Sequence, residues 1–222
     1  MSLALARGAA GYGAASRPAA PRRDYGEFFA KVAILTLFSS MAMRLAQEAA
    51  KTGHITGILM LASEALVVAF TLVRRSAGAV DRSWKARTLT LFSTFGPPLV
   101  RPITVSALSS ESLAVVISAI GLIIVVLGKL SLGRSFGLTP ANRGIVSTGV
   151  YRFLRHPIYL GYVLTHMGFA IAFPADWNLV ILIAADSALM MRAVCEEKTL
   201  ALDPAYRAYM QRVRWRVLPG VF

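Results

Sequence analysis

Six apolar segments restrict this 222-residue chain to a narrow set of folds. They lie at 28–50, 53–73, 88–108, 113–130, 159–173 and 177–194. A helix needs about 20 apolar residues to cross a bilayer, and the second and fourth segments meet that length. Only 16% of the residues are charged, whereas soluble domains average about a quarter. We therefore expect an all-α, polytopic transmembrane helical bundle.

The number of spans depends on the third and the last two segments. The third contains Pro97-Pro98 and Arg101, which interrupt a helix, so it either crosses or re-enters. The fifth and sixth are short and are joined by the tight turn 174–176. The sequence thus predicts five or six spans, with the last two forming a helical hairpin.

The basic residues predict the orientation in the membrane. The chain has 24 Lys and Arg against 11 Asp and Glu, a net charge of +13. If the N-terminus is cytoplasmic and all six segments cross, then 20 of these 24 share one side, in 1–27, 74–87, 129–158 and 192–216. Cytoplasmic loops carry such an excess. We expect a multi-pass protein of the bacterial inner membrane or endoplasmic reticulum, with its basic loops near anionic membrane lipid and no nucleic-acid partner.

The chain divides into three parts. Residues 1–27 are rich in Ala, Gly, Pro and Arg, which is typical of a disordered cytoplasmic tail. A signal peptide is the competing interpretation, but the stretch lacks a continuous apolar core. Residues 28–128 hold the N-terminal transmembrane helices. Residues 129–222 hold a glycine-rich loop, the helical hairpin and a C-terminal surface helix.

The surface helix has its own signals. Asp203 followed by Pro204 is a favourable helix start. Tyr206, Tyr209, Met210 and Val213 then share one face, and the opposite face is basic. This pattern predicts a helix that lies on lipid or on the glycine-rich loop.

Arg155-His156-Pro157 stands where the basic loop becomes apolar. Proline suits the first position of a helix, so the fifth helix is expected to begin at Pro157. Its free N–H groups and dipole favour an anion, and His156, Tyr159 and Arg155 add donors or charge. The simpler alternative is a helix cap with a positive flank.

Arg192 and Glu196 share a helix face because they are four residues apart. Arginine binds carboxylates in a bidentate manner, and glutamate attracts a positive centre. The alternative is a surface ion pair worth a few tenths of a kcal/mol. The single cysteine, Cys195, excludes an internal disulfide.

Two acidic residues fall inside apolar segments. Glu64 and Asp186 are costly there and are often functional when they occur. They are also candidates for structural pairing with Arg44, Arg101 or backbone groups, which we favour. His54 and His166 lack metal-ligand spacing, so no metal is predicted.

Taken together, these motifs resemble a known family. The run from Gly144 to Gly161, centred on Arg155-His156-Pro157-Ile158-Tyr159, is followed by Arg192-x-x-x-Glu196-Glu197 and by Tyr206-x-x-Tyr209-x-x-x-Val213. This combination resembles the isoprenylcysteine carboxyl methyltransferases, and the related phospholipid methyltransferases share a looser version. The resemblance covers 129–219. The chain departs from the prenylcysteine enzymes at Arg143, where those enzymes tend to carry a different polar residue.

The resemblance implies an integral membrane methyltransferase that uses S-adenosylmethionine (SAM) and releases S-adenosylhomocysteine (SAH). It assigns Arg192 to the acceptor and makes Arg192 and Glu196 the catalytic pair. The cofactor residues that it implies are Arg143, Gly144, Ile145, Val146, Tyr151, His156, Pro157, Ile158, Tyr159 and Glu196.

Several acceptors fit a lipidic or amphiphilic substrate that reaches the site from the bilayer. Carboxyl O-methylation of a prenylcysteine-like group is the archetype, and there Arg192 would orient the carboxylate. Phospholipid or amine N-methylation and thiol S-methylation are alternatives, for which Glu197 or His156 is a candidate base. A small transporter or cofactor-binding subunit is the non-catalytic alternative, but transporters centre polar groups at the midplane. The sequence leaves the oligomeric state open.

Overall fold

The computed structural model describes residues 25–73, 79–80, 83–103, 106–133, 141–142 and 145–222. The elements, in chain order, are α1 (Tyr25–Thr52), α2 (Thr56–Val73), β1 (Ala79–Val80), α3 (Trp84–Phe95), η1 (Pro97–Leu99), α4 (Glu111–Leu132), β2 (Ala141–Asn142), η3 (Gly149–Arg152), α5 (Pro157–Ala172), α6 (Asp176–Leu200) and α7 (Pro204–Arg212). The all-α prediction is confirmed except for β1 and β2, a two-residue antiparallel pair.

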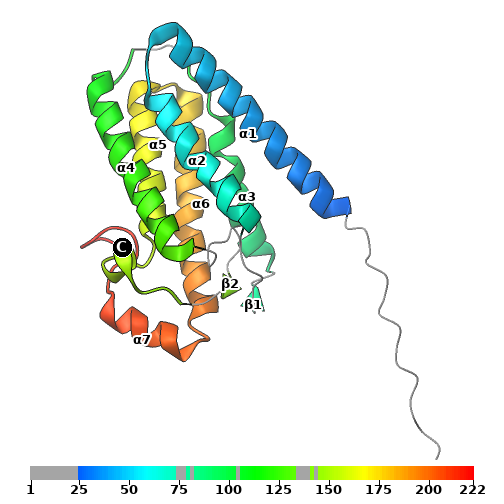
Figure 1. Cartoon of the computed structure of the whole chain (residues 1–222), viewed down its shortest axis with the longest axis vertical. Coiled ribbons are helices and arrows are strands. Elements are labelled where there is room, and N and C mark those ends of the chain that lie inside the picture. Colours follow the sequence, from blue (N-terminus) through cyan, green and yellow to red (C-terminus); the bar gives the residue numbers. More distant parts are fainter. Residues whose placement is uncertain (1–24, 74–78, 81–82, 104–105, 134–140, 143–144) are drawn as a thin grey trace, which may run out of the picture.

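Helices α2 to α6 form an up-and-down bundle, and α1 runs obliquely along one side of it (Figure 1). The short strands, η3 and α7 all lie at the end of the bundle where α5 begins and α6 ends. At the opposite end, Glu111 joins α4 to the start of α2: its Oε1 accepts from Ile55 N, Thr56 N and Thr56 Oγ1 at 3.1, 3.1 and 2.7 Å. The bundle therefore has one plain end and one end rich in loops.

The third apolar segment does not form one continuous helix. Helix α3 begins at Trp84 and ends at Phe95, so it has only 12 residues. Pro97 and Pro98 follow in a 3-10 turn, because proline lacks the N–H group that a helix interior needs. Beyond the turn, Asn178 holds the extended chain: Arg101 N donates to its Oδ1, and its Nδ2 donates to Arg101 O. The span count of five or six stays a prediction.

Small residues allow α4 and α5 to approach closely. The buried positions of α4 include Ala114, Ser118, Gly121, Val125 and Gly128, spaced alternately four and three residues apart. They face Gly161, Thr165, Gly168 and Ala172 of α5, which repeat with the same spacing. Such small-residue seams bring helix backbones together where side chains would separate them. This seam sets the position of the α5 N-terminus, where the candidate site lies.

Replacing Gly161 by alanine is expected to destabilise the protein. A Cβ at this position would lie 2.6 Å from Val125 Cγ2 and 2.7 Å from Gly121 O. Overpacking of this kind costs about 1–3 kcal/mol, which corresponds to a fall in Tm of about 2–12 °C for a chain of this size. Thermal unfolding in detergent measures the change. Gly57→Ala is the control, because its nearest neighbour, Leu45 Cδ2, would lie at 3.3 Å; equal Tm values for the two variants would contradict the seam.

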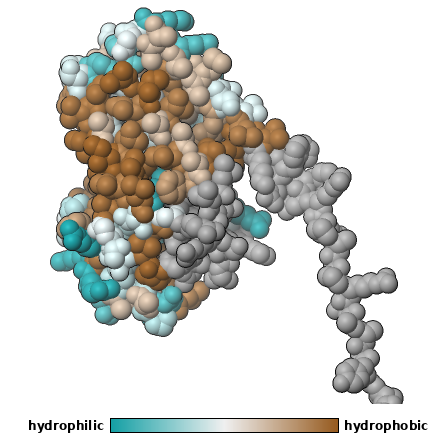
Figure 2. Space-filling model, in the orientation of Figure 1, coloured by the Kyte–Doolittle hydropathy of each residue, from teal (hydrophilic) through white to brown (hydrophobic). Residues whose placement is uncertain are grey.

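The outer surface of the bundle is apolar. By length and hydropathy, two of the described helices, α4 and α6, could each cross a membrane, and α2 and α5 contain shorter apolar stretches. The outward residues of α4 are Leu113, Val116, Ile120, Ile123, Leu127 and Leu130, all at least 45% exposed. In the space-filling view, apolar side chains cover the middle of the visible face and hydrophilic ones gather toward its ends (Figure 2). A soluble protein rarely exposes an apolar surface this large.

Candidate active site

The N-terminus of α5 is built as the sequence predicts. The helix begins at Pro157, and His156 is the N-cap residue. The C-terminal segment holds the approach to this helix, since Arg155 N donates to Trp215 O at 2.9 Å and His156 N donates to Arg216 O at 2.7 Å. No side chain caps the helix. Tyr159 N donates to His156 O, and Pro157 has no N–H group. The Ile158 N–H group and the helix dipole at this loop-rich end therefore remain to suit an anionic ligand group.

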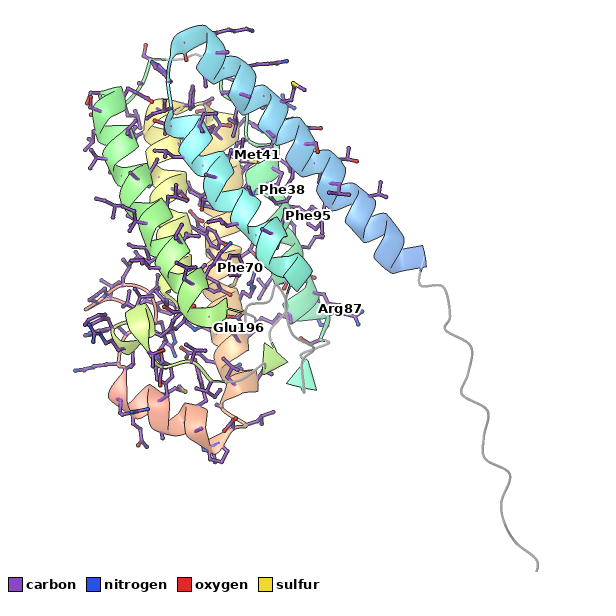
Figure 3. All side chains as sticks on the ribbon, in the orientation of Figure 1. Phe38, Met41, Phe70, Arg87, Phe95 and Glu196 are labelled. Carbon is purple, nitrogen blue, oxygen red and sulfur yellow. The ribbon has the colours of Figure 1, made fainter. Side chains whose placement is uncertain are left out.

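The end of α6 meets this helix start. His156 Nδ1 lies 3.6 Å from Glu196 Oε2, and the imidazole ring stacks on Tyr159 with centroids 5.1 Å apart. The Glu196 side chain is 16% exposed, and in Figure 3 it lies at the loop-rich end of the bundle, near the base of α4. The antiparallel hairpin explains the juxtaposition, because the first residues of α5 and the last turns of α6 must share one end. The structure thus brings together two residues that are 40 positions apart in the chain.

Arg192 links Glu196 to the interior. Its Nε donates to Glu196 Oε1 at 3.5 Å, and its Nη1 donates to Ser93 Oγ of α3 at 3.2 Å. The guanidinium also lies over the Tyr159 ring, 5.2 Å from the centroid. The Arg192 side chain is only 5% exposed, so the alternative of a solvated surface pair is wrong. Buried charges with specific partners are costly, and they concentrate at functional sites.

Glu197 is the residue whose role sequence reasoning missed. Its Oε1 lies 3.2 Å from Arg155 Nη1 and 3.3 Å from His156 Nε2. Its Oε2 accepts from Arg216 Nε at 2.8 Å. This one carboxylate therefore fastens α6 to the α5 N-terminus and to the C-terminal segment. The only sequence signal was the adjacent acidic pair, which did not show that the two side chains have different partners.

The loop before α5 is held by α7. Asp203 caps α7 by accepting from Ala205 N, and Tyr206, Tyr209 and Val213 are buried together, which confirms the predicted surface helix. Tyr209 OH donates to Tyr151 O at 2.7 Å and lies 3.3 Å from Leu154 O. Desolvation by burial raises the pKa of the Tyr209 hydroxyl, so it stays a hydrogen-bond donor. Helix α7 thus packs against the glycine-rich loop, one of the two predicted surfaces.

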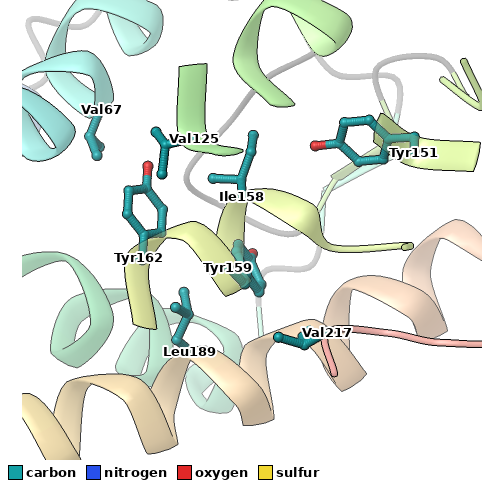
Figure 4. Close-up of a cluster of buried hydrophobic side chains, with 9 residues drawn as sticks. Val67, Val125, Tyr151, Ile158, Tyr159, Tyr162, Leu189 and Val217 are labelled. Carbon is teal, nitrogen blue, oxygen red and sulfur yellow. The ribbon is translucent and has the colours of Figure 1, made fainter. Parts of the chain in front are cut away.

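The remaining residues that the resemblance assigned to the cofactor fall into three groups. Arg143 and Gly144 lie outside the described residues. Ile145 packs on the buried side chains of Tyr206 and Tyr209. Tyr151 belongs to the buried hydrophobic cluster drawn in Figure 4, and Val146 packs against that cluster. Ile158 is 3% exposed and faces Gly128 of α4, so only its backbone is free to contact a ligand.

The polar groups at this end suit SAM. The helix N-terminus matches a carboxylate, and Glu196 matches an amine or a sulfonium. Among the described side chains at this end, the hydroxyl of Tyr206 is buried without a hydrogen-bond partner, although buried polar groups normally have one. The Glu196 carboxylate, the helix N-terminus and this hydroxyl are therefore suited to bind a polar, zwitterionic ligand.

Glu64 and Asp186 do not pair with Arg44 or Arg101 through any contact in the described part of the chain. Both instead contact His166, at 3.4 and 2.6 Å. Arg44 donates to Pro98 O, and Arg101 stacks on Trp177. The structural partner predicted for the two acids was therefore wrong, because helix packing places His166 between them.

Comparison with known protein families gives a match over the part of the chain that holds most of the candidate site. Residues 108–207 match the family model described as phospholipid methyltransferase, which confirms the family resemblance. Among curated proteins, none matches the chain. The matched region contains His156, Arg192, Glu196 and Glu197.

Proposed function

Because the part of the chain that forms this site matches the phospholipid methyltransferase family, we propose that the protein is a membrane methyltransferase that transfers a methyl group from SAM to a lipidic or amphiphilic acceptor. The observation that carries the proposal is the meeting of the α5 N-terminus, His156, Glu196 and Arg192 at one end of an apolar bundle. SAM supplies an electrophilic methyl group on a sulfonium.

In the proposed mechanism, this chain binds and orients both reactants. The Ile158 N–H group at the start of α5 and the ring of His156 would hold anionic and polar groups of the donor. Glu196 would face its positive centre. Arg192 orients the acceptor, and the buried rings of Tyr159 and Tyr162 exclude water. Positioning and removal of water supply most of the acceleration that an in-line methyl transfer requires.

Two acceptor chemistries follow from the site. A prenylcysteine-like carboxylate would pair with Arg192, and this is the archetype of the resembling enzymes. A phospholipid amine is favoured by the matched family and by the carboxylates around Arg192, and a thiol is a further protic nucleophile of the same kind. In either case the apolar outer surface of α4 and α6 indicates an acceptor that approaches through lipid. We place the site on the cytoplasmic face because of the distribution of basic residues.

Ligand binding tests the function directly. Purified protein in detergent should bind SAH saturably below millimolar concentration in calorimetry, and it should shift to higher Tm with ligand. Tritiated SAM should then label either a farnesylcysteine analogue or phosphatidylethanolamine in vesicles, offered in parallel. Absence of heat and of a thermal shift at millimolar SAH would refute the proposal. Tight SAH binding with no labelled acceptor would favour the alternative of a cofactor-binding subunit.

A further inference from the structure

A second polar site lies inside the bundle, deeper than the cofactor end. A cavity of about 20 Å³ opens between α2, α3, α5 and α6, which is room for about one small polar group. Val67, Ala185 and Leu189 form its apolar wall. Its polar lining comprises Glu64, Ser93, Thr94, Tyr162, His166, Asp186 and Arg192.

The cavity contains a histidine held between two carboxylates. His166 Nδ1 lies 2.6 Å from Asp186 Oδ1, and Nε2 lies 3.4 Å from Glu64 Oε1. A neutral imidazole has one N–H group and would turn a lone pair toward one of the two carboxylates. If both acids are ionised, both contacts are attractive only when both nitrogens carry a proton, and the ring is then an imidazolium. The cluster of Glu64, His166 and Asp186 then carries a net charge of −1.

Glu64 is the more weakly held carboxylate of this cluster. Its contact with the ring is 0.8 Å longer than that of Asp186, from 3.4 and 2.6 Å, and its side chain is 5% exposed. The Tyr162 ring stacks on His166 with centroids 6.4 Å apart, and the Tyr162 hydroxyl is buried without a hydrogen-bond partner. An unsatisfied hydroxyl beside a loosely held carboxylate, in a cavity, indicates a site that binds a polar group.

Charged groups from each neighbouring helix act on Glu64. Lys129 of α4 lies over the Tyr162 ring at 5.4 Å and in the field of Glu64. From α6, Arg192 lines the cavity, although Glu196 already offsets its charge at 3.5 Å. From α3 only the hydroxyls of Ser93 and Thr94 face the cavity. In the described part of the chain, His166, Lys129 and Arg192 are therefore the basic side chains around Glu64.

The cavity borders the candidate active site at Arg192, which lines the cavity and also contacts Glu196. On α6, Glu196, Arg192, Leu189 and Ala185 are spaced four, three and four residues apart and share one face. On α5, His156, Tyr159, Tyr162 and His166 form the facing stripe. A rise of 1.5 Å per residue places Asp186 about 9 Å deeper than Arg192 along the helix. A small polar group of the acceptor, such as an ammonium, that enters this cavity beside Arg192 is enclosed by a lining that also includes Glu64.

We propose that Glu64 is the proton acceptor of this active site, with His166 and Asp186 as the residues that position it. This inference rests on the proposed methyl transfer. Glu197 cannot serve as that base, because Arg155, Arg216 and His156 already hold its carboxylate. Glu64 has no arginine within ion-pair distance among the described residues, and it lines the cavity that Arg192 also lines.

With an amine as acceptor, the proposed reaction consists of proton transfer to Glu64 followed by methyl transfer to nitrogen. An alkylammonium gives one proton to the Glu64 carboxylate and becomes a neutral amine. The nitrogen lone pair forms a bond to the methyl carbon, and the carbon–sulfur bond breaks with its electron pair on sulfur, which leaves the thioether SAH and a methylated ammonium. Glu64 returns its proton to water before the next turnover. A carboxylate acceptor carries no proton at neutral pH and needs no such base.

The test compares Glu64→Gln with wild type on phosphatidylethanolamine vesicles across pH. General-base removal typically costs 10²–10⁴-fold, so we expect kcat/KM at pH 7 to fall by about 100-fold or more. Above about pH 10 the amine loses its proton to solvent, and the deficit should shrink to below about tenfold. A purely structural role of Glu64 would lower the rate equally at every pH, and that result would overturn the proposal.

Two controls separate this proposal from the proposed function. SAH affinity of Glu64→Gln should stay within about twofold of wild type, because Glu64 lies away from the helix N-terminus. Loss of SAH binding in wild type itself would refute the methyltransferase, whereas normal binding with unchanged amine methylation in Glu64→Gln would refute only the base. Glu111→Gln is the matched variant: its carboxylate also faces a histidine, His54 at 4.0 Å, but at the opposite end. It should retain full activity.

A measurement without turnover tests the charge state. The chain has three histidines, His54, His156 and His166, so ¹⁵N-labelled histidine spectra can be assigned by single substitutions. Both nitrogens of His166 should be protonated at pH 7, and Asp186→Asn should remove that signature. A neutral His166 ring in wild type would overturn the cluster as described. So would a wild-type enzyme that methylates the farnesylcysteine carboxylate but no amine.

Discussion

Replacing Glu196 by alanine is expected to abolish measurable SAH binding. The carboxylate lies between His156 Nδ1 at 3.6 Å and Arg192 Nε at 3.5 Å. Its removal therefore leaves the buried Arg192 Nε without its acceptor and takes away the proposed partner of a ligand amine. Truncating one partner of a buried charge pair costs about 2–5 kcal/mol, and 3 kcal/mol corresponds to about a 150-fold rise in Kd. Calorimetry with SAH measures the change.

Two further variants separate charge from shape. Glu196→Gln keeps the shape of the side chain and loses its charge, so it should lower the affinity for cationic SAM more than the affinity for neutral SAH. Arg192→Ala should keep SAH binding within a few-fold and lower kcat/KM by at least about 100-fold, because Arg192 lines the cavity in which we propose that the acceptor binds. Full activity and unchanged SAH affinity in both alanine variants would remove this site assignment.

Replacing Glu197 by alanine is expected to cause a large loss of stability. Its carboxylate is 5% exposed and contacts Arg155, whose side chain is 7% exposed. Removing one partner of a buried ion pair costs about 3–5 kcal/mol, since the other charge stays buried. For a chain of this size the corresponding fall in Tm is about 6–20 °C. The C-terminal segment should also become accessible to protease, because Arg216 loses its partner.

The neighbouring position provides the control. Lys198 follows Glu197 directly and is exposed, so Lys198→Ala should leave Tm nearly unchanged. Arg216→Ala should have an intermediate effect, because the Arg216 side chain is 33% exposed and water replaces part of its contact. A Tm for Glu197→Ala equal to that of Lys198→Ala would show that the three-way junction contributes no stability.

Much of the local structure could be predicted from residue chemistry. The starts of α5 at Pro157 and of α7 at Pro204 follow from proline at the first helical position, with Asp203 as the cap of α7. Hydropathy predicts the long apolar helices α4 and α6. Hydropathy does not predict the end of α3 at Phe95, because Pro97 and Pro98 end the helix while the apolar segment continues.

The site was only partly predictable. Spacing places Arg192 and Glu196 on one helix face, but it cannot show that this face is buried or that Ser93 of α3 contacts it. Adjacent residues on a helix point about 100° apart, which is why Glu196 and Glu197 have separate partners. The direction of each side chain identifies its partner only when the positions of the neighbouring helices are known.

Sequence by itself determined which segments are apolar, where α5 and α7 begin, and which motifs stand at the helix ends, because hydropathy and capping depend on neighbouring residues alone. Only the tertiary structure decided that His156 faces Glu196, that Glu197 joins three segments, and that His166 lies between Glu64 and Asp186. Those contacts join residues between 19 and 102 positions apart. They are set by the close packing of α4 on α5 and by the antiparallel hairpin of α5 and α6, and local spacing encodes neither.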